Sequence, residues 1–376
     1  MRFPEFSGEW TKIKLGDLGS FFSGGTPSSS RKDFYGGEIP FIRSGELHSD
    51  STALSITKEA YDSCSAKMVN KGDLLLALYG ATSGDISISR ISGAINQAIL
   101  CIRPQYMDAY FIKSLWEKHK KHILETYLQG GQGNLSSEII KNISFFFPNS
   151  DEQFKISRLI HIIDDRIETQ SKIIEELTTL RSALLEKVFQ VSNPTLEVGA
   201  IAHQTSERNK LCRYSNVLSV SNRFGFINQS EQFEDRNVAS DDVRNYKVVH
   251  RGDFAYNPAR INVGSIAMLK RFDSGIVSPM YICFQIDDSI VDPSFFELFL
   301  ETKAFKDEME IRLEGSVRRC LSFEALCEIH LPHPALLVQR SISDKIGNIS
   351  SKIKLEDRIL RAYIRQKEWL LRQMFI

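Results

Sequence analysis

Residues 339–376 repeat a segment from the middle of the chain. They align with residues 153–190 at a constant offset of 186 and without a gap. Ten positions are identical, where roughly two matches would arise by chance in so short a window. The identical pairs are Gln153/Gln339, Ile156/Ile342, Ser157/Ser343, Ile160/Ile346, Ile163/Ile349, Ile167/Ile353, Ile173/Ile359, Leu184/Leu370, Leu185/Leu371 and Phe189/Phe375. Neither segment contains proline, and apolar residues recur mostly every three or four positions, so both are predicted to be long helices with a matching hydrophobic seam.

Weaker matches extend the repeat upstream at offsets of 180 to 186, as loop insertions in two copies of one domain would produce. Val69–Asp73 resembles Val249–Asp253, and Leu135-Ser136 matches Leu321-Ser322. The sequence therefore predicts two globular domains, each followed by a long helix. The expected segments are a first globular domain at 1–150, a central helix at 151–192, a second globular domain at 193–338 and a C-terminal helix at 339–376.

The order of these segments constrains how the two helices meet. The first helix must carry the chain from one globular domain to the other, and the second helix starts at the second domain. Its seam is best buried against the first helix, so we predict an antiparallel coiled coil. The charges agree, because residues 151–190 carry 6 basic and 8 acidic residues whereas residues 339–376 carry 9 and 4. At roughly 37 residues, such a helix would be about 55 Å long.

Short apolar runs bounded by turn residues predict strands within the globular domains. The expected strands are 73–78, 86–91, 99–102, 265–269 and 281–286, and the expected shorter helices are 108–126 and 292–313. The predicted fold class is therefore α+β, with two similar globular α/β domains separated by two long antiparallel helices.

Composition excludes several classes of protein. Basic and acidic residues number 47 each, so no overall positive charge indicates a nucleic-acid partner, although a locally basic groove stays open. No apolar run approaches the roughly 20 residues that span a bilayer. The N-terminal Met-Arg-Phe-Pro-Glu-Phe lacks the apolar region of a signal peptide. We therefore expect a cytoplasmic protein without a membrane partner.

The chain also lacks clear enzymatic motifs. It has no phosphate-binding glycine loop and no nucleophile elbow. Asn257-Pro258-Ala259-Arg260 begins like the base pocket of an amino-methyltransferase, but it has arginine where a stacking aromatic residue belongs, which favours a simple turn. The histidine pairs His119/His122 and His330/His333 lack the intervening glutamate of a zinc protease. We expect no catalytic residues, no metal site and no cofactor.

Each copy also contains short phrases that bear on which family the chain is similar to. The first copy contains Trp10–Leu18, Ile39–Glu46, Gly72-Asp73, Asn96-Gln97 and Gly130–Ser136, and the second contains Gly252-Asp253, Asn257–Gly264 and Gly315–Ser322. Together with the duplicated helices, this arrangement resembles the specificity subunit of type I restriction–modification systems, over nearly the whole chain. The resemblance implies a non-catalytic subunit that reads double-stranded DNA while partner subunits methylate and cleave it. The implied partners are two modification (methyltransferase) subunits and the restriction (helicase-nuclease) subunits.

Residues that can contact bases or phosphates occur in loops of both copies. The candidate DNA-binding residues are Arg43, Tyr79, Thr82, Ser83, Asn96, Gln97, Gln132 and Asn134 in the first copy and Arg260, Asn262, Ser278, Arg318 and Arg319 in the second. Lys113, Lys118, Lys120 and Lys121 around Trp116 are expected to form one exposed helix face. The long helices carry more apolar residues than one seam between two helices can bury. Those expected to face outward are candidates for docking the modification subunits: Ile162, Leu180, Leu355, Leu360 and Trp369.

Two other classes of function stay open from the sequence. A scaffold protein could use the helices to space two ligand-binding domains without any role on DNA. An enzyme would rest on Asn257-Pro258 alone. Under the DNA-reading hypothesis, an antiparallel pair presents its two domains about a two-fold axis, as a DNA duplex presents two half-sites. Because the loops of the two copies differ, we expect an asymmetric bipartite target with an unread spacer.

Overall fold

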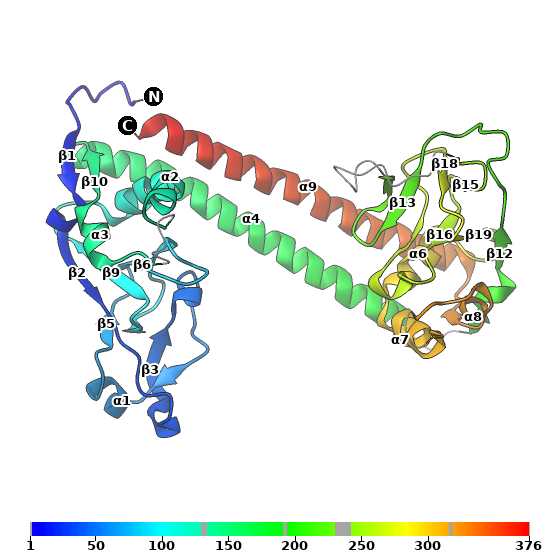
Figure 1. The fold of residues 1–376 in the computed structure, drawn as a ribbon, viewed down its shortest axis with the longest axis horizontal. Helices are drawn as coiled ribbons and strands as arrows, with labels where there is room; N and C mark the ends of the chain where they lie inside the picture. The colour runs from blue at the N-terminus through cyan, green and yellow to red at the C-terminus, as the bar shows by residue number, and fades with distance from the viewer. Residues whose placement is uncertain (1, 129–133, 191–193, 230–241, 316–318, 376) are drawn as a thin grey trace. The chain divides into compact units, whose positions relative to one another are not determined.

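The repeated helices are the longest elements of the computed structural model, which describes residues 2–128, 134–190, 194–229, 242–315 and 319–375. Helix α4 spans Ser150–Gln190 and helix α9 spans Leu336–Met374. The chain divides into two compact units. The first contains residues 1–172 and 358–376, and the second contains residues 173–357. Each unit therefore holds one globular domain together with part of both long helices (Figure 1).

The first unit contains two small sheets and a strand pair. Strand β1 (Thr11–Lys14) pairs with β10 (Ser144–Phe147), and a four-stranded antiparallel sheet has the order β2 (Gly19–Ser23), β9 (Ile99–Pro104), β6 (Leu74–Ala77), β7 (Ile86–Ile88). The other sheet has the order β4 (Ser55–Ile56), β3 (Tyr35–Ile42), β8 (Gly93–Ile95), β5 (Lys67–Val69). In this sheet β3 and β8 are parallel. The helices are α1 (Lys58–Asp62), α2 (Ala109–Leu128) and α3 (Ser137–Asn142).

The second unit repeats much of this plan. Strand β11 (Thr195–Glu197) pairs with β20 (His330–Pro332), and the four-stranded antiparallel sheet has the order β12 (Ala202–Thr205), β19 (Ile282–Ile286), β16 (Phe254–Tyr256), β17 (Ile266–Met268). Two further antiparallel pairs are β13 (Leu218–Ser221) with β14 (Gly225–Asn228), and β15 (Lys247–His250) with β18 (Ser274–Val277). The helices are α6 (Pro293–Glu301), α7 (Lys303–Arg312) and α8 (Phe323–Cys327). The two domains thus share one sheet order, and the predicted α+β class is confirmed.

The expected single helix over 292–313 is wrong. Two helices occupy this segment, because Thr302 has an extended backbone (φ −71°, ψ 158°) and ends α6. Its hydroxyl accepts a hydrogen bond of 3.1 Å from the backbone N–H of Phe305 and thereby caps α7. A threonine cap of this kind favours the start of a new helix over one continuous helix. Sequence periodicity does not reveal the break, because α6 and α7 each keep an apolar face.

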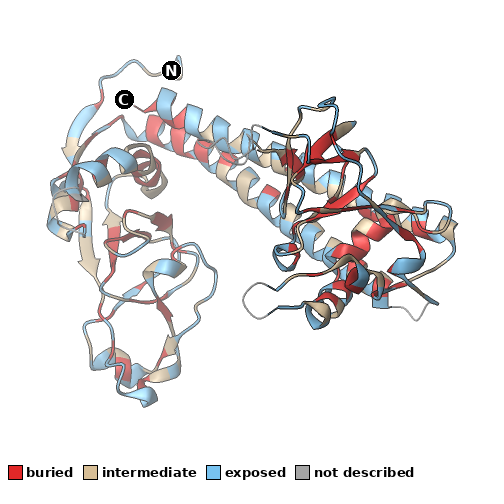
Figure 2. Ribbon diagram, turned by 45° about the vertical axis from the view of Figure 1, so that its right-hand side comes forward, coloured by how far each residue is buried: buried red, intermediate tan, exposed pale blue. Residues whose placement is uncertain are grey.

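The seam of the long helices is buried within each unit (Figure 2). In the first unit Ile156, Ile160 and Ile163 of α4 pack with Leu370 and Phe375 in one hydrophobic core. There Asp164 pairs with Lys367, and the Arg166 guanidinium lies 5.9 Å from the ring centre of Tyr363. Residue numbers rise along α4 as they fall along α9, so the two helices run antiparallel in this unit, as predicted. In the second unit, the core contains Leu185, Phe189 and Ile346.

Candidate nucleic-acid interface

Three loop segments of the first unit meet beyond the end of β6. The backbone N–H of Leu78 donates to the Ala98 carbonyl at 2.8 Å, and the N–H of Leu135 donates to the Leu78 carbonyl at 2.9 Å. Gly84 has a φ of +80° and closes the β6–β7 loop with a hydrogen bond from its N–H to the Ala77 carbonyl. Only glycine adopts this backbone conformation at no steric cost. The framework therefore brings the loops that carry Tyr79, Gln97 and Asn134 to one place.

The side chains of this cluster divide into two groups. Ser83 and Asn96 bond within their own loops, since the Ser83 hydroxyl donates to the Leu78 carbonyl and the Asn96 amide oxygen accepts from the backbone of Ala98. Gln97 and Asn134 are exposed, and Thr82 is half-buried.

Tyr79 keeps its hydroxyl proton. Burial raises its pKa, and a hydrogen bond with Gln97 opposes this shift only in part. The hydroxyl is therefore a neutral donor and acceptor. Gln97 is also hydrogen-bonded to Thr26, so Tyr79, Gln97 and Thr26 form one polar group at the loop surface.

Arg43 lies at the end of β3, which is parallel to β8. The backbone N–H of Asn96 donates to the Ile42 carbonyl at 3.3 Å, so Arg43 and Asn96 follow neighbouring strand ends. The Arg43 guanidinium pairs with Glu46 at 3.1 Å. This pairing raises the pKa of Arg43 and lowers that of Glu46. A DNA contact by Arg43 would have to compete with this carboxylate.

Two hydrogen bonds of this loop framework recur in the second unit. The N–H of Asn257 donates to the Ser265 carbonyl at 3.1 Å, as that of Ala77 donates to Asp85 in the first unit, and the N–H of Leu321 donates to the Pro258 carbonyl at 3.2 Å. Gly264 has a φ of +86° at the position that matches Gly84. The residues in these hydrogen bonds correspond to those of the first unit at the sequence offsets of 180 and 186.

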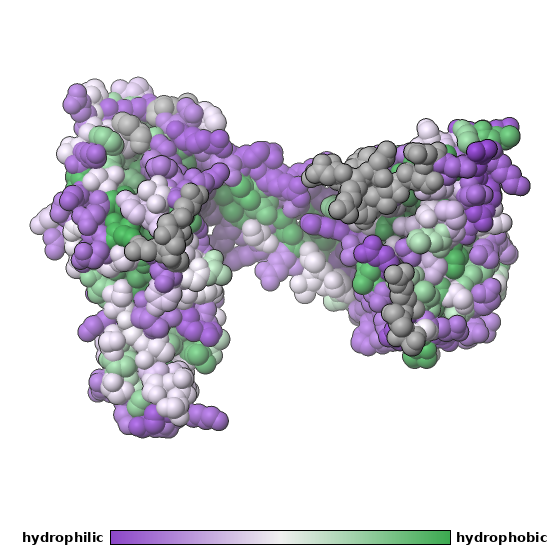
Figure 3. Space-filling view, viewed as in Figure 1, coloured by the Kyte–Doolittle hydropathy of each residue, from purple (hydrophilic) through white to green (hydrophobic). Residues whose placement is uncertain are grey.

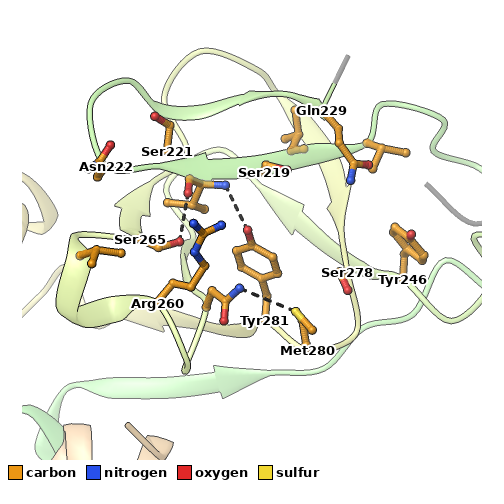
Figure 4. A pocket seen from close by; sticks show the side chains of 15 residues that line it. Ser219, Ser221, Asn222, Gln229, Tyr246, Arg260, Ser265, Ser278, Met280 and Tyr281 are labelled. Carbon is orange, nitrogen blue, oxygen red and sulfur yellow. Dashed lines mark hydrogen bonds between the residues drawn. The ribbon is translucent and has the colours of Figure 1, made fainter. Parts of the chain in front are cut away.

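A cavity of about 380 Å³ opens beside this framework in the second unit. It is lined by the β13–β14 hairpin, the β16–β17 loop and the β18–β19 loop (Figure 4). Its lining includes two of the candidate residues, Arg260 and Ser278. The other described candidates of this copy do not line it. Asn262 is exposed, and Arg319 is paired with Glu310 at 2.9 Å.

The floor of the cavity is held by internal hydrogen bonds. The Ser265 hydroxyl donates to the Val220 carbonyl at 3.0 Å, and the backbone N–H of Val220 donates to the Tyr281 hydroxyl at 3.4 Å. Beneath Tyr281, the buried Lys247 ammonium donates to its carbonyl at 2.6 Å, and burial lowers the pKa of this lysine. The hairpin is thus attached to the sheet, which keeps the cavity in shape.

Several lining residues were not singled out from the sequence: Ser219, Asn222, Gln229, Tyr246 and Met280. The available signal was the alternating run at Leu218–Ser221, followed by a glycine-containing turn at Gly225, which is typical of a β-hairpin. Sequence alone does not say which loops such a hairpin adjoins, because that is decided by non-local packing.

The expected exposed lysine face of 113–121 is wrong. Lys113 is buried and paired with Asp164 at 3.0 Å, Lys118 donates to the Phe375 carbonyl, and Lys120 pairs with Asp85. Only Lys121 of the four is fully exposed, at 89% of its side-chain surface. Helix α2 is covered on more sides than its lysines suggested, because α4 and the end of α9 pack against it.

Gln132 and Arg318 lie outside the described residues. Among the docking candidates, Ile162, Leu180, Leu355 and Trp369 are 43–49% exposed, and Leu360 is half-buried. Figure 3 shows apolar surface along the long helices. Within the described ranges, no three His, Cys, Asp or Glu side chains cluster as a metal site would require, and no helix is long and apolar enough to cross a membrane.

The sequence resembles proteins of one family. Residues 7–179 match the family model described as the type I restriction modification DNA specificity domain. The MjaVIII specificity subunit of Methanocaldococcus jannaschii is 23% identical over 391 aligned positions, which cover 95% of this chain and 89% of the relative. The MjaIX specificity subunit of the same organism is 28% identical, over 48% of this chain and 44% of the relative. In that match the chain spans less than half of its relative's length.

Solved structures share the fold. The type I restriction-modification S subunit from M. genitalium superposes with a TM-score of 0.65 and 16% identity, over 100% of this chain and 99% of that one. A chain from a structure describing complex assembly and conformational transition of the type I R-M system gives 0.53 and 13% identity, over 98% of both chains. At these identities the likeness establishes a common fold.

Proposed function

We propose that the chain is a member of the type I restriction–modification DNA specificity family and the DNA-recognition subunit of such a system. Each globular domain reads one half of a bipartite target in double-stranded DNA. The observation that carries this proposal is the duplicated loop framework. Two equivalent backbone hydrogen bonds hold the loops in each unit, while the side chains that the loops present differ.

The differences predict two unlike half-sites. The first unit offers Tyr79, Gln97 and Asn134 on its loops, whereas the second offers Arg260 and Ser278 at a cavity. Base edges are distinguished by the donors and acceptors that face them, so different side chains on one framework read different bases. The long helices would set the distance between the half-sites and dock the modification subunits.

We assign no catalytic step to the chain. Asn257, the one residue in a methyltransferase-like motif, accepts a hydrogen bond from the backbone of Ala259 at 3.1 Å, as an Asx turn does. Metal-dependent nucleases often carry a carboxylate two residues before a lysine. The chain has this spacing at Glu301-Thr302-Lys303. There Glu301 pairs with Arg181, and Lys303 pairs with Asp307. Methylation and cleavage would belong to the modification and restriction subunits, in the cytoplasm.

The zero net charge bears on the partners. Affinity for DNA rises with the number of phosphates that are neutralised, so a neutral chain binds weakly by itself. We therefore place part of the phosphate contact on two modification subunits. A scaffold without a DNA role is not favoured, because the relatives matched over the chain are all named specificity subunits.

Methylation mapping tests the proposal. The full chain is co-produced with its modification subunits, and methylated positions are sequenced in a plasmid library of random inserts. We expect one asymmetric bipartite sequence. Modification subunits without the chain are the control and should give no defined sequence. Absence of duplex binding by the full complex would favour the scaffold alternative instead.

A further inference from the structure

Arg260 differs from the other described candidate arginines in having no acidic partner. Arg43 pairs with Glu46, and Arg319 pairs with Glu310. No hydrogen bond or ion pair of the Arg260 guanidinium is found in the part of the chain that the structure describes. Among the described residues that line the cavity, Arg260 is also the one with a formal charge. Within this described lining, the positive charge of Arg260 has no acidic partner.

The backbone of Arg260 is nonetheless fixed. Its carbonyl accepts hydrogen bonds from the N–H groups of Val263 at 3.2 Å and Ser265 at 3.1 Å, and its own N–H donates to the Asn257 carbonyl at 2.9 Å. Gly264, at φ +86°, completes the turn. The side chain thus projects from a rigid turn into the cavity (Figure 4). A fixed backbone with a free guanidinium is suited to directional hydrogen bonding, since little further ordering is needed on binding.

The lining also offers side chains that both donate and accept, such as the Asn222 amide and the Ser278 hydroxyl. A phosphate offers acceptors only, whereas the major-groove edge of a base pair offers both acceptors and amino donors, so it matches a lining of this kind. Met280, which is 62% exposed, adds an apolar rim that helps to exclude water.

Resting on the proposed function, we propose that Arg260 reads a guanine in the second half-site. The planar guanidinium donates two hydrogen bonds to O6 and N7 of the guanine in the major groove, which is the commonest specific contact of arginine with DNA. Arg260 is therefore a specificity-determining residue rather than a general anchor for the backbone of DNA.

Lysine at position 260 separates the two modes of contact. Lysine keeps the charge but loses the planar fork, so a phosphate contact largely survives Arg260→Lys whereas a bidentate guanine contact is weakened. Wild type, Arg260→Lys and Arg260→Ala are each mapped in the full complex with the modification subunits. Arg251→Ala is the matched control, because its exposed guanidinium pairs with Asp273 at 2.7 Å, away from the cavity.

We expect both Arg260 variants to relax one position of the second half-site. At that position the preference for guanine should fall roughly 5- to 100-fold, while the other positions, the whole first half-site and the Arg251→Ala control keep their preferences. If Arg260→Ala reduced methylation equally at all sequences and Arg260→Lys restored it, Arg260 would contact a phosphate, and the inference would be overturned. Unchanged preferences in both variants would overturn it as well. If the wild-type complex itself showed no defined target, the proposed function would fail instead.

Discussion

Ser157 of helix α4 donates a hydrogen bond of 2.6 Å to the carboxylate of Asp108. The same carboxylate accepts from the backbone N–H of Phe111 at 2.7 Å and so caps helix α2. In the second unit Ser343 donates to Asp292 at 2.8 Å, and Asp292 caps α6 in the same way. In each unit a serine of the long helix thus bonds to the residue that caps a helix of the preceding globular domain.

Replacing Ser157 with alanine should destabilise the first unit. The substitution removes a charge-assisted hydrogen bond in a part-buried site, so we expect a loss of about 1–3 kcal/mol in the free energy of unfolding. The measurement is urea unfolding of the full chain. Ser171→Ala is the control, because that exposed hydroxyl bonds only to the carbonyl of Ile167 in its own helix. Equal stability of the two variants would contradict the expectation.

The residues that make these contacts are among the identical pairs of the repeat, but the repeat does not show what they contact. Ser157/Ser343 are identical in the two copies, and so are Gln153/Gln339, whose amide groups donate to the carbonyls of Pro148 and Pro334 at 2.8 Å. Polar identities inside an apolar seam indicated a shared constraint. The partners of the two serines lie 49 residues away for Ser157 and 51 for Ser343, and periodicity carries no information on such distant partners.

A partly buried ionic cluster fixes the C-terminal end of α9 in the first unit. Lys367 pairs with Glu117 at 2.7 Å and with Asp164 at 2.8 Å. The matching position in the second unit is Arg181, which pairs with Glu301 at 2.8 Å.

Lys367→Ala should destabilise the first unit because it leaves two carboxylates without their shared cation. The cost should lie between the roughly 0–1 kcal/mol of an exposed pair and the roughly 3–5 kcal/mol of a fully buried one. Thermal unfolding of the full chain measures it. Lys172→Ala, which removes an exposed pair with Glu168, should cost less than Lys367→Ala, and the reverse order would be inconsistent with this role.

The same cluster predicts a dependence of stability on pH. Burial alone would raise the pKa of Asp164, but the ammonium groups of Lys113 and Lys367 outweigh it and lower the pKa. Such a carboxylate stabilises the folded state fully above its unfolded pKa of about 3.9, and this contribution is lost as the pH falls through the lower folded value. The stability difference between wild type and Asp164→Asn should therefore be constant from pH 7 to about pH 5 and shrink below about pH 4. A difference that grew on acidification would contradict it.

The exposed apolar residues of the long helices should bind the modification subunits. Aspartate in place of Ile162, Leu180, Leu355 or Trp369 should abolish co-purification with these subunits while the fold stays intact, because each side chain is already 43–49% exposed. Leu360 is half-buried, so its variant should also lose some stability. Ser171→Asp is the polar control on α4. Retention of the complex by several of these variants would place the docking face elsewhere.

The candidate site was only partly predictable from the sequence. Loop positions were identified where a short motif recurred, as with Gly72 and Gly252, because a backbone with positive φ favours glycine in both copies. The β13–β14 hairpin that encloses the cavity has a different counterpart in the first unit, where β3 pairs with β4 and β8. Recognition loops diverge while the supporting framework does not, so self-comparison finds the framework and misses the site.

The helices should act as a ruler for the target. Removing about seven residues, two turns, from both α4 and α9 should shorten the unread spacer and leave the bases of both half-sites unchanged. Methylation mapping of the shortened chain with its modification subunits gives the answer. A spacer that kept its length, or half-sites that changed their bases, would be evidence against this role of the helices.

The central claim is that each globular domain reads its own half-site. The most direct measurement exchanges residues 1–150 for the first recognition domain of another specificity subunit and maps methylation by the full complex. The account predicts that one half-site changes to that of the donor protein, while the other half-site, including the guanine assigned to Arg260, stays the same. A change in both half-sites, or in neither, would contradict it.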